Sequence, residues 1–136
     1  MNDAQWKSLV LVAQKARKKA YAPYSGYQVG AAILAPDGRV FAGCNVENAS
    51  YGLALCAERS AVAHLIAAGG RAIVALAVVT AGPEPGTPCG LCRQTLAEFA
   101  DDLPIALAVA GERSPRVVKN LRDLFPDPFR ADLKKT

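Results

Sequence analysis

The N-terminal segment places apolar residues with the period of an α-helix. They recur every three or four positions, at Trp6, Leu9, Val10, Ala13, Ala16 and Ala20. This spacing gathers them in one stripe, while the lysines and Arg17 occupy the other faces. The pattern therefore predicts an amphipathic helix over residues 3–20 whose apolar stripe covers a sheet.

Four later segments have the character of β-strands. Residues 27–35 and 39–44 flank a Pro-Asp-Gly turn, so they predict a hairpin with a tight reversal. Residues 72–79 are apolar throughout and rich in β-branched side chains, which is typical of a strand that is covered on both faces. Residues 105–109 predict a fourth strand.

Two further helices complete the expected order of elements. Residues 54–68 are rich in helix formers and are followed by two glycines, which can end a helix. A stretch rich in Pro and Gly, residues 81–88, leads to a third helix over residues 90–100. The order helix, hairpin, helix, strand, helix, strand predicts an α/β fold, a three-layer α/β/α sandwich with a mixed sheet. A chain of 136 residues suits one domain, residues 1–136.

The composition narrows the classes of protein that fit. With 51% hydrophobic and 21% charged residues the chain is typical of a compact globular protein, and no segment has the apolar length of a bilayer span. The net charge of +4 owes much to cations of the first helix, which have no aromatic rings among them, so we expect a solvated face and no nucleic-acid partner. The N-terminus lacks the features of a secretory signal, which predicts a cytoplasmic location.

The most informative chemistry is a set of cysteines beside one glutamate. Glu58 lies two residues after Cys56, and Cys89 and Cys92 are three residues apart at the start of an expected helix. In a reducing compartment such cysteines favour metal binding over disulfides, and the spacing of the last two lets them grip one ion. Helix N-termini also favour thiolates. Three ligands leave a tetrahedral Zn²⁺ open to water, and a carboxylate alongside predicts a hydrolytic centre.

Two arginines are candidates for balancing the charge of such a centre. Three thiolates on Zn²⁺ leave one net negative charge, which weakens the acidity of bound water. Arg59 and Arg93 each immediately follow a motif residue. Because a guanidinium can donate hydrogen bonds to thiolate sulfur and withdraw charge, both are expected to support the metal ligands.

Other roles for the cysteines and the single histidine remain open at this point. Cys44 could complete a closed four-cysteine site, but such sites usually pair two short Cys-x-x-Cys motifs, and eleven residues separate Cys44 from Cys56. We expect Cys44 to be a small buried residue. A redox role for the Cys-x-x-Cys pair would leave Cys56 and Glu58 without a function. His64 has no partner at a suggestive spacing and is expected to be structural.

Several stretches together resemble the small homotetrameric, zinc-dependent cytidine deaminases over nearly the whole chain. Zinc deaminases as a class combine a ligand-x-Glu motif with Pro-Cys-x-x-Cys, and here the first ligand is a cysteine. The matching stretches are residues 21–25, 29–32, 43–52, 56–59 and 88–94. The resemblance implies hydrolytic deamination at C4 of cytidine and 2′-deoxycytidine, with Cys56, Cys89 and Cys92 holding zinc and Glu58 moving protons.

The resemblance also implies residues that bind the substrate. Asn45 and Glu47 look like the ribose-hydroxyl binders of the family, although alone they would suggest a polar turn. The backbone at Ala57 is expected to contact the base, and Tyr27 stands where the family usually has phenylalanine. Phe129 lies in a tail similar to the family's Leu-Leu-Pro-x-x-Phe, whose ring caps the base in a neighbouring subunit's site. A tail packed within its own domain is the alternative.

Rival functions follow from the same residues. A blasticidin-type aminonucleoside deaminase has a similar zinc centre but recognises a different sugar, which Asn45 and Glu47 argue against. A zinc-stapled interaction domain would need the metal but not Glu58. Editing of polynucleotides is disfavoured because little chain remains beyond the zinc core to form a strand-binding channel.

Overall fold

A five-stranded mixed sheet forms the middle layer of the protein. The structure is a computed structural model and describes residues 1–131. The strands are β1 (Gly30–Leu34), β2 (Val40–Cys44), β3 (Ala75–Thr80), β4 (Pro104–Val109) and β5 (Val117–Asn120). They lie in the order β2-β1-β3-β4-β5, with β3 and β4 parallel and the other neighbouring pairs antiparallel.

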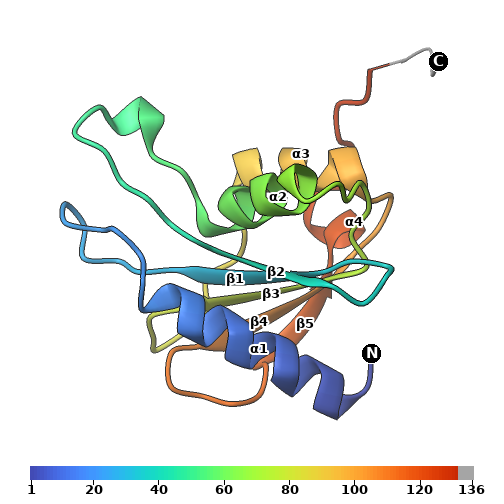
Figure 1. Ribbon diagram of the computed structural model, residues 1–136, viewed down its shortest axis with the longest axis horizontal. Coiled ribbons are helices and arrows are strands. Elements are labelled where there is room, and N and C mark those ends of the chain that lie inside the picture. The colour runs from blue at the N-terminus through green and yellow to red at the C-terminus, as the bar shows by residue number, and fades with distance from the viewer. Residues whose placement is uncertain (132–136) are drawn as a thin grey trace.

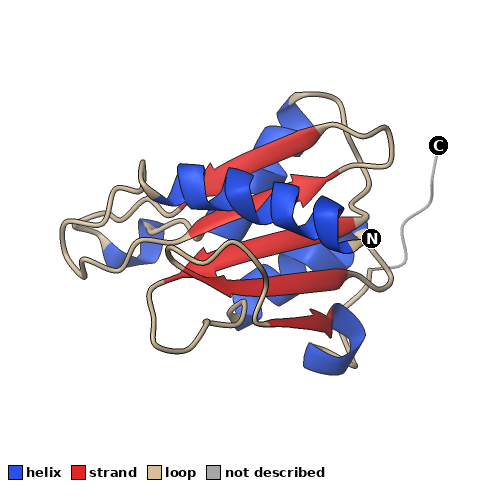
Figure 2. Cartoon of the chain, turned by 90° about the horizontal axis from the view of Figure 1, so that it is seen from below, coloured by secondary structure: helices blue, strands red, loops and turns tan. Residues whose placement is uncertain are grey.

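Helices cover both faces of this sheet. They are α1 (Asp3–Arg17), α2 (Ala57–Ala67), α3 (Gly90–Phe99) and the short α4 (Leu121–Leu124), with a 3₁₀ turn at Tyr51–Leu53. Figure 1 shows α1 on one side of the sheet and α2 and α3 on the other, and Figure 2 shows α1 lying across the strands. The predicted three-layer α/β/α sandwich with a mixed sheet is confirmed.

The central strand β3 contributes to two separate apolar clusters. All six of its residues are buried, as expected for a strand covered on both faces. Alternate side chains of a strand point to opposite faces, so Ala77 and Val79 pack towards α1 and Trp6, whereas Leu76 and Val78 pack in the cluster under α2 and α3. Helices α2 and α3 therefore pack side by side on one face of the sheet.

A glycine lets α2 lie close to the sheet. A Cβ atom built on Gly43 of β2 would lie 2.4 Å from the backbone nitrogen of Ala61 and 2.5 Å from the carbonyl oxygen of Ala57. Both contacts are far inside van der Waals distance, so only glycine permits this approach. The start of α2 is thereby set against the end of β2.

Some boundaries and two elements differ from the sequence-based expectation. Helix α1 ends at Arg17 rather than at residue 20, and α2 begins at Ala57 rather than at residue 54, because the preceding chain forms a 3₁₀ turn and an isolated bridge from Leu55 to Val46. Strand β5 and helix α4 were not predicted. All four residues of β5 are exposed, so it lacks the apolar alternation that marks a half-buried strand.

Among residues 1–131, every helix is too short or too polar to serve as a membrane span.

Candidate metal centre and active site

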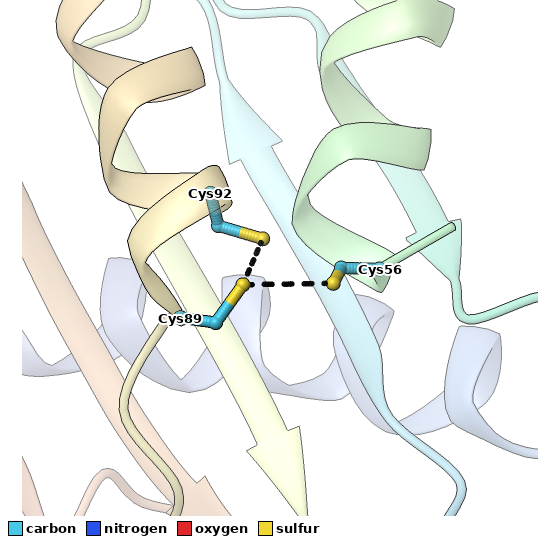
Figure 3. A group of neighbouring side chains, drawn as sticks. All are labelled: Cys56, Cys89 and Cys92. Carbon is cyan, nitrogen blue, oxygen red and sulfur yellow. Dashed lines mark hydrogen bonds between the residues drawn. The ribbon is translucent and has the colours of Figure 1, made fainter. Parts of the chain in front are cut away.

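Three cysteines from two helix starts meet at one point. Cys56 is the N-cap of α2, Cys89 is the N-cap of α3, and Cys92 lies in the first turn of α3. The Sγ atoms of Cys56 and Cys89 are 3.7 Å apart, and those of Cys89 and Cys92 are 3.6 Å apart (Figure 3). All three sulfurs lie within 4.8 Å of one another. Sequence spacing had predicted this group.

The group fits a tetrahedral zinc ion. Zn–S bonds of about 2.3 Å place the sulfurs of one tetrahedral site about 3.8 Å apart, close to the observed separations. Cys44 lies outside the group and is half-buried, lining a surface pocket with Lys15 of α1 and with Lys19, which follows the end of α1. Within residues 1–131 the centre thus has three cysteine ligands, and the closed four-cysteine alternative is not what the structure shows.

Cys56 and Cys92 differ in how readily their thiols ionise. Hydrogen bonding, first from Cys92 and then from Arg59 and Cys89, lowers the pKa of Cys56 to about 5. The same contact with the Cys56 thiolate, followed by burial, raises the pKa of Cys92. Cys56 is therefore the preferred thiolate. A divalent cation would draw the remaining protons off, because a bound metal deprotonates its thiol ligands.

Arg59 lies against this centre as the sequence predicted. Its terminal nitrogen donates to the carbonyl oxygen of Ala54 at 3.0 Å and lies 3.6 Å from Cys56 Sγ. The Nε atom of Arg59 is buried and has no hydrogen-bond partner among residues 1–131. A buried N–H group usually has a hydrogen-bond acceptor, and the thiolates of a metal centre would supply one here. This supports the assignment of the three cysteines as metal ligands.

Arg93 occupies a different position. It donates from Nε to the carbonyl oxygen of Pro88 at 2.7 Å, and from its terminal nitrogens to the carbonyl oxygen of Leu124 at 2.6 Å and to the hydroxyl of Thr87 at 3.3 Å. These bonds tie the loop before Cys89 to the end of α4. The guanidinium is thus used on backbone and hydroxyl oxygens rather than on sulfur.

Glu58 is buried at the first turn of α2, two residues after Cys56. Its exposed fraction is 5%, which is unusual for a carboxylate that forms no salt bridge among residues 1–131. Burial raises the pKa of Glu58, and the negative charge of Cys56 adds to the rise, against an opposing hydrogen bond with Cys92. Residues two apart on a helix point in different directions, but Cys56 has non-helical backbone angles, so this restriction does not apply to its side chain.

The predicted ribose-binding residues lie between the end of β2 and the 3₁₀ turn, on a segment that extends beyond the sheet in Figure 1. The Asn45 side chain accepts from Val29 N and donates to Tyr27 O, both at 2.8 Å. The Glu47 carboxylate accepts from the backbone N–H groups of Tyr24 and Ser25 and from the Ser25 hydroxyl. Both side chains therefore also organise the loop that carries Tyr27.

The aromatic candidates are partly open to solvent. Tyr27 is 44% exposed, and its hydroxyl would lie 3.1 Å from a Cβ built on Gly86, next to the loop that leads to Cys89. Phe129 is 74% exposed and is attached through its backbone to α3. Ala57 is fully buried as the first residue of α2, where backbone N–H groups have no partner within the helix.

Two residues with clear contacts at the site were missed by sequence reasoning. Ser25 binds the Glu47 carboxylate, and Gln94 binds the backbone of Phe129. Each contact joins segments more than 20 residues apart, so no local periodicity indicates it. His64 has the structural surroundings that were expected, with Nδ1 3.2 Å from the carbonyl oxygen of Ala42 and its ring edge-on to Phe41.

Comparison with known proteins bears directly on this centre. Residues 3–107 match the family model described as the cytidine and deoxycytidylate deaminase zinc-binding region. The chain belongs to the cytidine deaminase family. The zinc prediction is confirmed, because the family model describes a zinc-binding region and the three sulfurs are positioned to hold a metal ion.

Individual relatives of the cytidine deaminase family match over most of their length. The chain is 46% identical over 132 residues to the cytidine deaminase of Mycobacterium tuberculosis H37Rv, covering 97% of this chain and 95% of the relative. It is 53% identical over 91 residues to the cytidine deaminase of Halalkalibacterium halodurans, covering 67% and 69%. The crystal structure of cytidine deaminase from Burkholderia pseudomallei matches with a TM-score of 0.83 and 48% identity, covering 90% of this chain and 97% of that one.

Proposed function

We propose that the protein is a zinc-dependent cytidine deaminase that converts cytidine and 2′-deoxycytidine to uridine and 2′-deoxyuridine with release of ammonia. The observation that carries the proposal is a buried carboxylate, Glu58, two residues from a metal ligand in a centre with three cysteines. The family membership of the chain supports the reaction. The reaction belongs to pyrimidine salvage, and a cytoplasmic location accords with the four free cysteines.

Glu58 carries the protons of the reaction. Zinc, when bound, supplies a Lewis acid that makes water more acidic at neutral pH. Glu58 accepts a proton from the water and delivers it to N3 of the pyrimidine, and the second proton of the water passes to the amino group. The water oxygen bonds to C4, the C4–N bond breaks, and ammonia leaves. The raised pKa of Glu58 suits a group that must hold a proton between these transfers.

The neighbouring residues orient the nucleoside. Asn45 and Glu47 offer an amide and a carboxylate to the ribose hydroxyls, and the Glu47 carboxylate is already held by Ser25. The free N–H groups at Ala57 bind the base, and the ring of Tyr27 stacks on it. Arg59 draws negative charge from Cys56, which keeps the centre electrophilic.

The working form is proposed to be a homotetramer with shared active sites. Large apolar side chains are unusually exposed on the segments around the centre, at 78% for Tyr51, 69% for Leu53 and 66% for Leu91. Exposed large apolar side chains on segments that adjoin metal ligands in the chain support an interface there. In this arrangement Phe129 of one subunit caps the base in the site of another.

Two alternatives make different predictions. A blasticidin-type deaminase would share the metal centre but would have no need for the Glu47 carboxylate at the sugar. A zinc-stapled domain would tolerate the loss of Glu58. Neither explains a buried carboxylate beside the metal ligands as well as cytidine deamination does.

Glu58→Gln tests the proposal directly. The variant should lose at least about 100-fold in kcat, because a positioned acid–base group contributes about 10²–10⁴ in rate. Zinc content and the unfolding transition should be unchanged. Turnover is followed by the ultraviolet change from cytidine to uridine, with and without a strong chelator, and Glu98→Gln on the exposed face of α3 is the matched control. Turnover retained in Glu58→Gln, or no turnover by the zinc-loaded wild type, would overturn the proposal.

A further inference from the structure

One side chain of α3 holds the backbone of Phe129 from both ends. The Nε2 atom of Gln94 donates to the carbonyl oxygen of Phe129 at 2.8 Å, and the backbone N–H of Phe129 donates to Oε1 of Gln94 at 3.2 Å. A side-chain amide that pairs with both polar groups of one residue fixes that residue's position and its orientation. Gln94 lies two residues after Cys92, in the first half of α3.

Other contacts also attach the C-terminal tail, residues 124–130, to α3 and to the residues beside it. Arg93 donates to the carbonyl oxygen of Leu124, and Arg130 donates to the carbonyl oxygen of Ala97. Arg130 also lies 3.9 Å from a carboxylate oxygen of Asp101. The tail is thus fastened to α3 on both sides of Phe129, and the Gln94 pair is the attachment at Phe129 itself.

The Phe129 ring has little apolar contact to hold it. It is 74% exposed, so its place in space depends on the backbone that carries it. Pro126 and Pro128 lack N–H groups and have restricted φ angles, which makes the segment stiff but leaves it few hydrogen bonds of its own. The two bonds to Gln94 therefore decide where the ring is presented.

We propose that Gln94 is a positioning residue that presents the Phe129 ring to the substrate of a neighbouring copy of the chain. This inference rests on the proposed function, in which Phe129 caps the base in another subunit's site. Gln94 touches neither substrate nor metal in this role and acts only through Phe129. Its loss should therefore weaken binding without disturbing the chemistry at Glu58.

The test compares Gln94→Met, which keeps the side-chain length but removes both hydrogen bonds, with the wild type. KM for cytidine should rise about tenfold, since two net hydrogen bonds of ordinary strength are lost, and kcat should stay within about twofold, because a cap contributes equally to ground and transition states. Gln94→Glu keeps the acceptor for Phe129 N–H and should fall between the two. Thr95→Val is the matched control and should match the wild type, because among residues 1–131 the Thr95 hydroxyl donates only to Leu91 O within α3.

A double-mutant cycle decides whether Gln94 acts through the ring. In the background of Phe129→Ala, Gln94→Met should change KM by less than about twofold, because the ring that it positions is gone. A further tenfold rise in that background would overturn the proposal. So would a Gln94→Met effect confined to kcat, or one accompanied by loss of zinc.

Hydrogen exchange separates this inference from the proposed function. The Phe129 amide should exchange faster in Gln94→Met than in the wild type, and at the wild-type rate in Thr95→Val. This expectation does not depend on the substrate of the protein. Equal protection of the Phe129 amide in Gln94→Met and in the wild type would show that the Gln94 side chain does not hold the Phe129 backbone. Faster exchange combined with wild-type kinetics in both Gln94→Met and Phe129→Ala overturns instead the role of Phe129 at a neighbouring site, and the positioning role with it.

Discussion

Glu47 shows how one carboxylate is prepared for a ligand before the ligand arrives. It accepts hydrogen bonds from the backbone N–H groups of Tyr24 and Ser25 and from the Ser25 hydroxyl. The hydroxyl bond lowers the pKa of Glu47, so the side chain is ionised throughout the neutral range. A fixed anion at this place can accept hydrogen bonds from sugar hydroxyls without first being ordered.

Glu47→Gln should therefore raise KM for cytidine about 10- to 100-fold, since a charge-assisted hydrogen bond is replaced by a neutral one. Zinc content should not change, because Glu47 is not among the metal-binding group. Steady-state kinetics and metal analysis check both points. Ser25→Ala should move KM in the same direction by a smaller factor. Unaltered kinetics in Glu47→Gln would remove the ribose assignment.

Residue-scale prediction found the cysteine group because its signal was local. The three cysteines and Glu58 lie in two short motifs, and ligand chemistry alone indicates what such motifs do. Arg59 follows from the need for a positive charge beside thiolates. Arg93 was assigned the same task on sequence grounds, but its guanidinium reaches Leu124, which lies 31 residues away in the chain. Contacts of that range depend on the tertiary fold and leave no periodic trace.

Helix α2 depends on a missing side chain in its neighbour. Gly43→Ala would drive a Cβ atom against the backbone of Ala57 and Ala61, so α2 must shift. We expect a loss of about 1–3 kcal/mol in the free energy of unfolding, as for overpacking generally. Zinc affinity should also fall, because Cys56 moves with α2. Denaturant unfolding and competition with a chelator measure the two effects. Gly52→Ala, where no atom lies within 4 Å of the added Cβ, should be close to wild type in both.

The start of α4 provides a pH-dependent contact. Asp102 Oδ1 accepts from Leu103 N at 2.8 Å and from Arg122 N at 3.0 Å, and these bonds lower the pKa of Asp102 below its ordinary value of 3.8. A lowered folded-state pKa stabilises the folded protein above the unfolded value, and the contribution is lost as pH falls through the folded value.

Asp102→Ala should therefore be less stable than the wild type by a constant margin from pH 7 down to about 5, and the margin should shrink below pH 4. Urea unfolding of both proteins with a chelator present throughout measures the margin without interference from zinc release. A margin that persists undiminished at pH 3 would show that Asp102 acts through packing and not through its charge.

At the scale of elements, the sequence predicted the helices and strands that have a clear hydrophobic periodicity and missed those that lack one. The long apolar stripe of α1 and the fully buried β3 were predicted correctly within a few residues. Strand β5 and helix α4 are four residues each, and β5 is exposed throughout. Elements that short are held by neighbours: β5 pairs with β4, and α4 begins at the Asp102 contact. Their own residues carry little information about them.

The proposed sharing of active sites can be tested on the whole molecule by mixing subunits of two variants, each of which lacks a different part of the site. Glu58→Gln lacks the proton carrier and Phe129→Ala lacks the cap. After dissociation and reassembly at equal amounts, about a quarter of the sites should combine Glu58 of one subunit with Phe129 of another and recover wild-type kcat/KM. Mixing should restore nothing if each Phe129 serves its own subunit's site. Native mass spectrometry establishes the number of subunits.

The single domain over residues 1–136 remains a prediction. The two apolar clusters share the sheet, so they should unfold together. A calorimetric trace with one transition for the zinc-loaded protein would support this, and two resolved transitions would contradict it.

The positions of the sulfur ligands have a consequence for the life of the protein in a cell. Cys56 and Cys89 are 33 residues apart and meet only because the folded sheet brings the starts of α2 and α3 together. An unfolded chain can offer an ion little more than the nearby Cys89 and Cys92 pair, so zinc binds the folded form far better and protects it from degradation. Under zinc starvation the amount of the protein should decline, while the molecules that still hold zinc work at their normal rate.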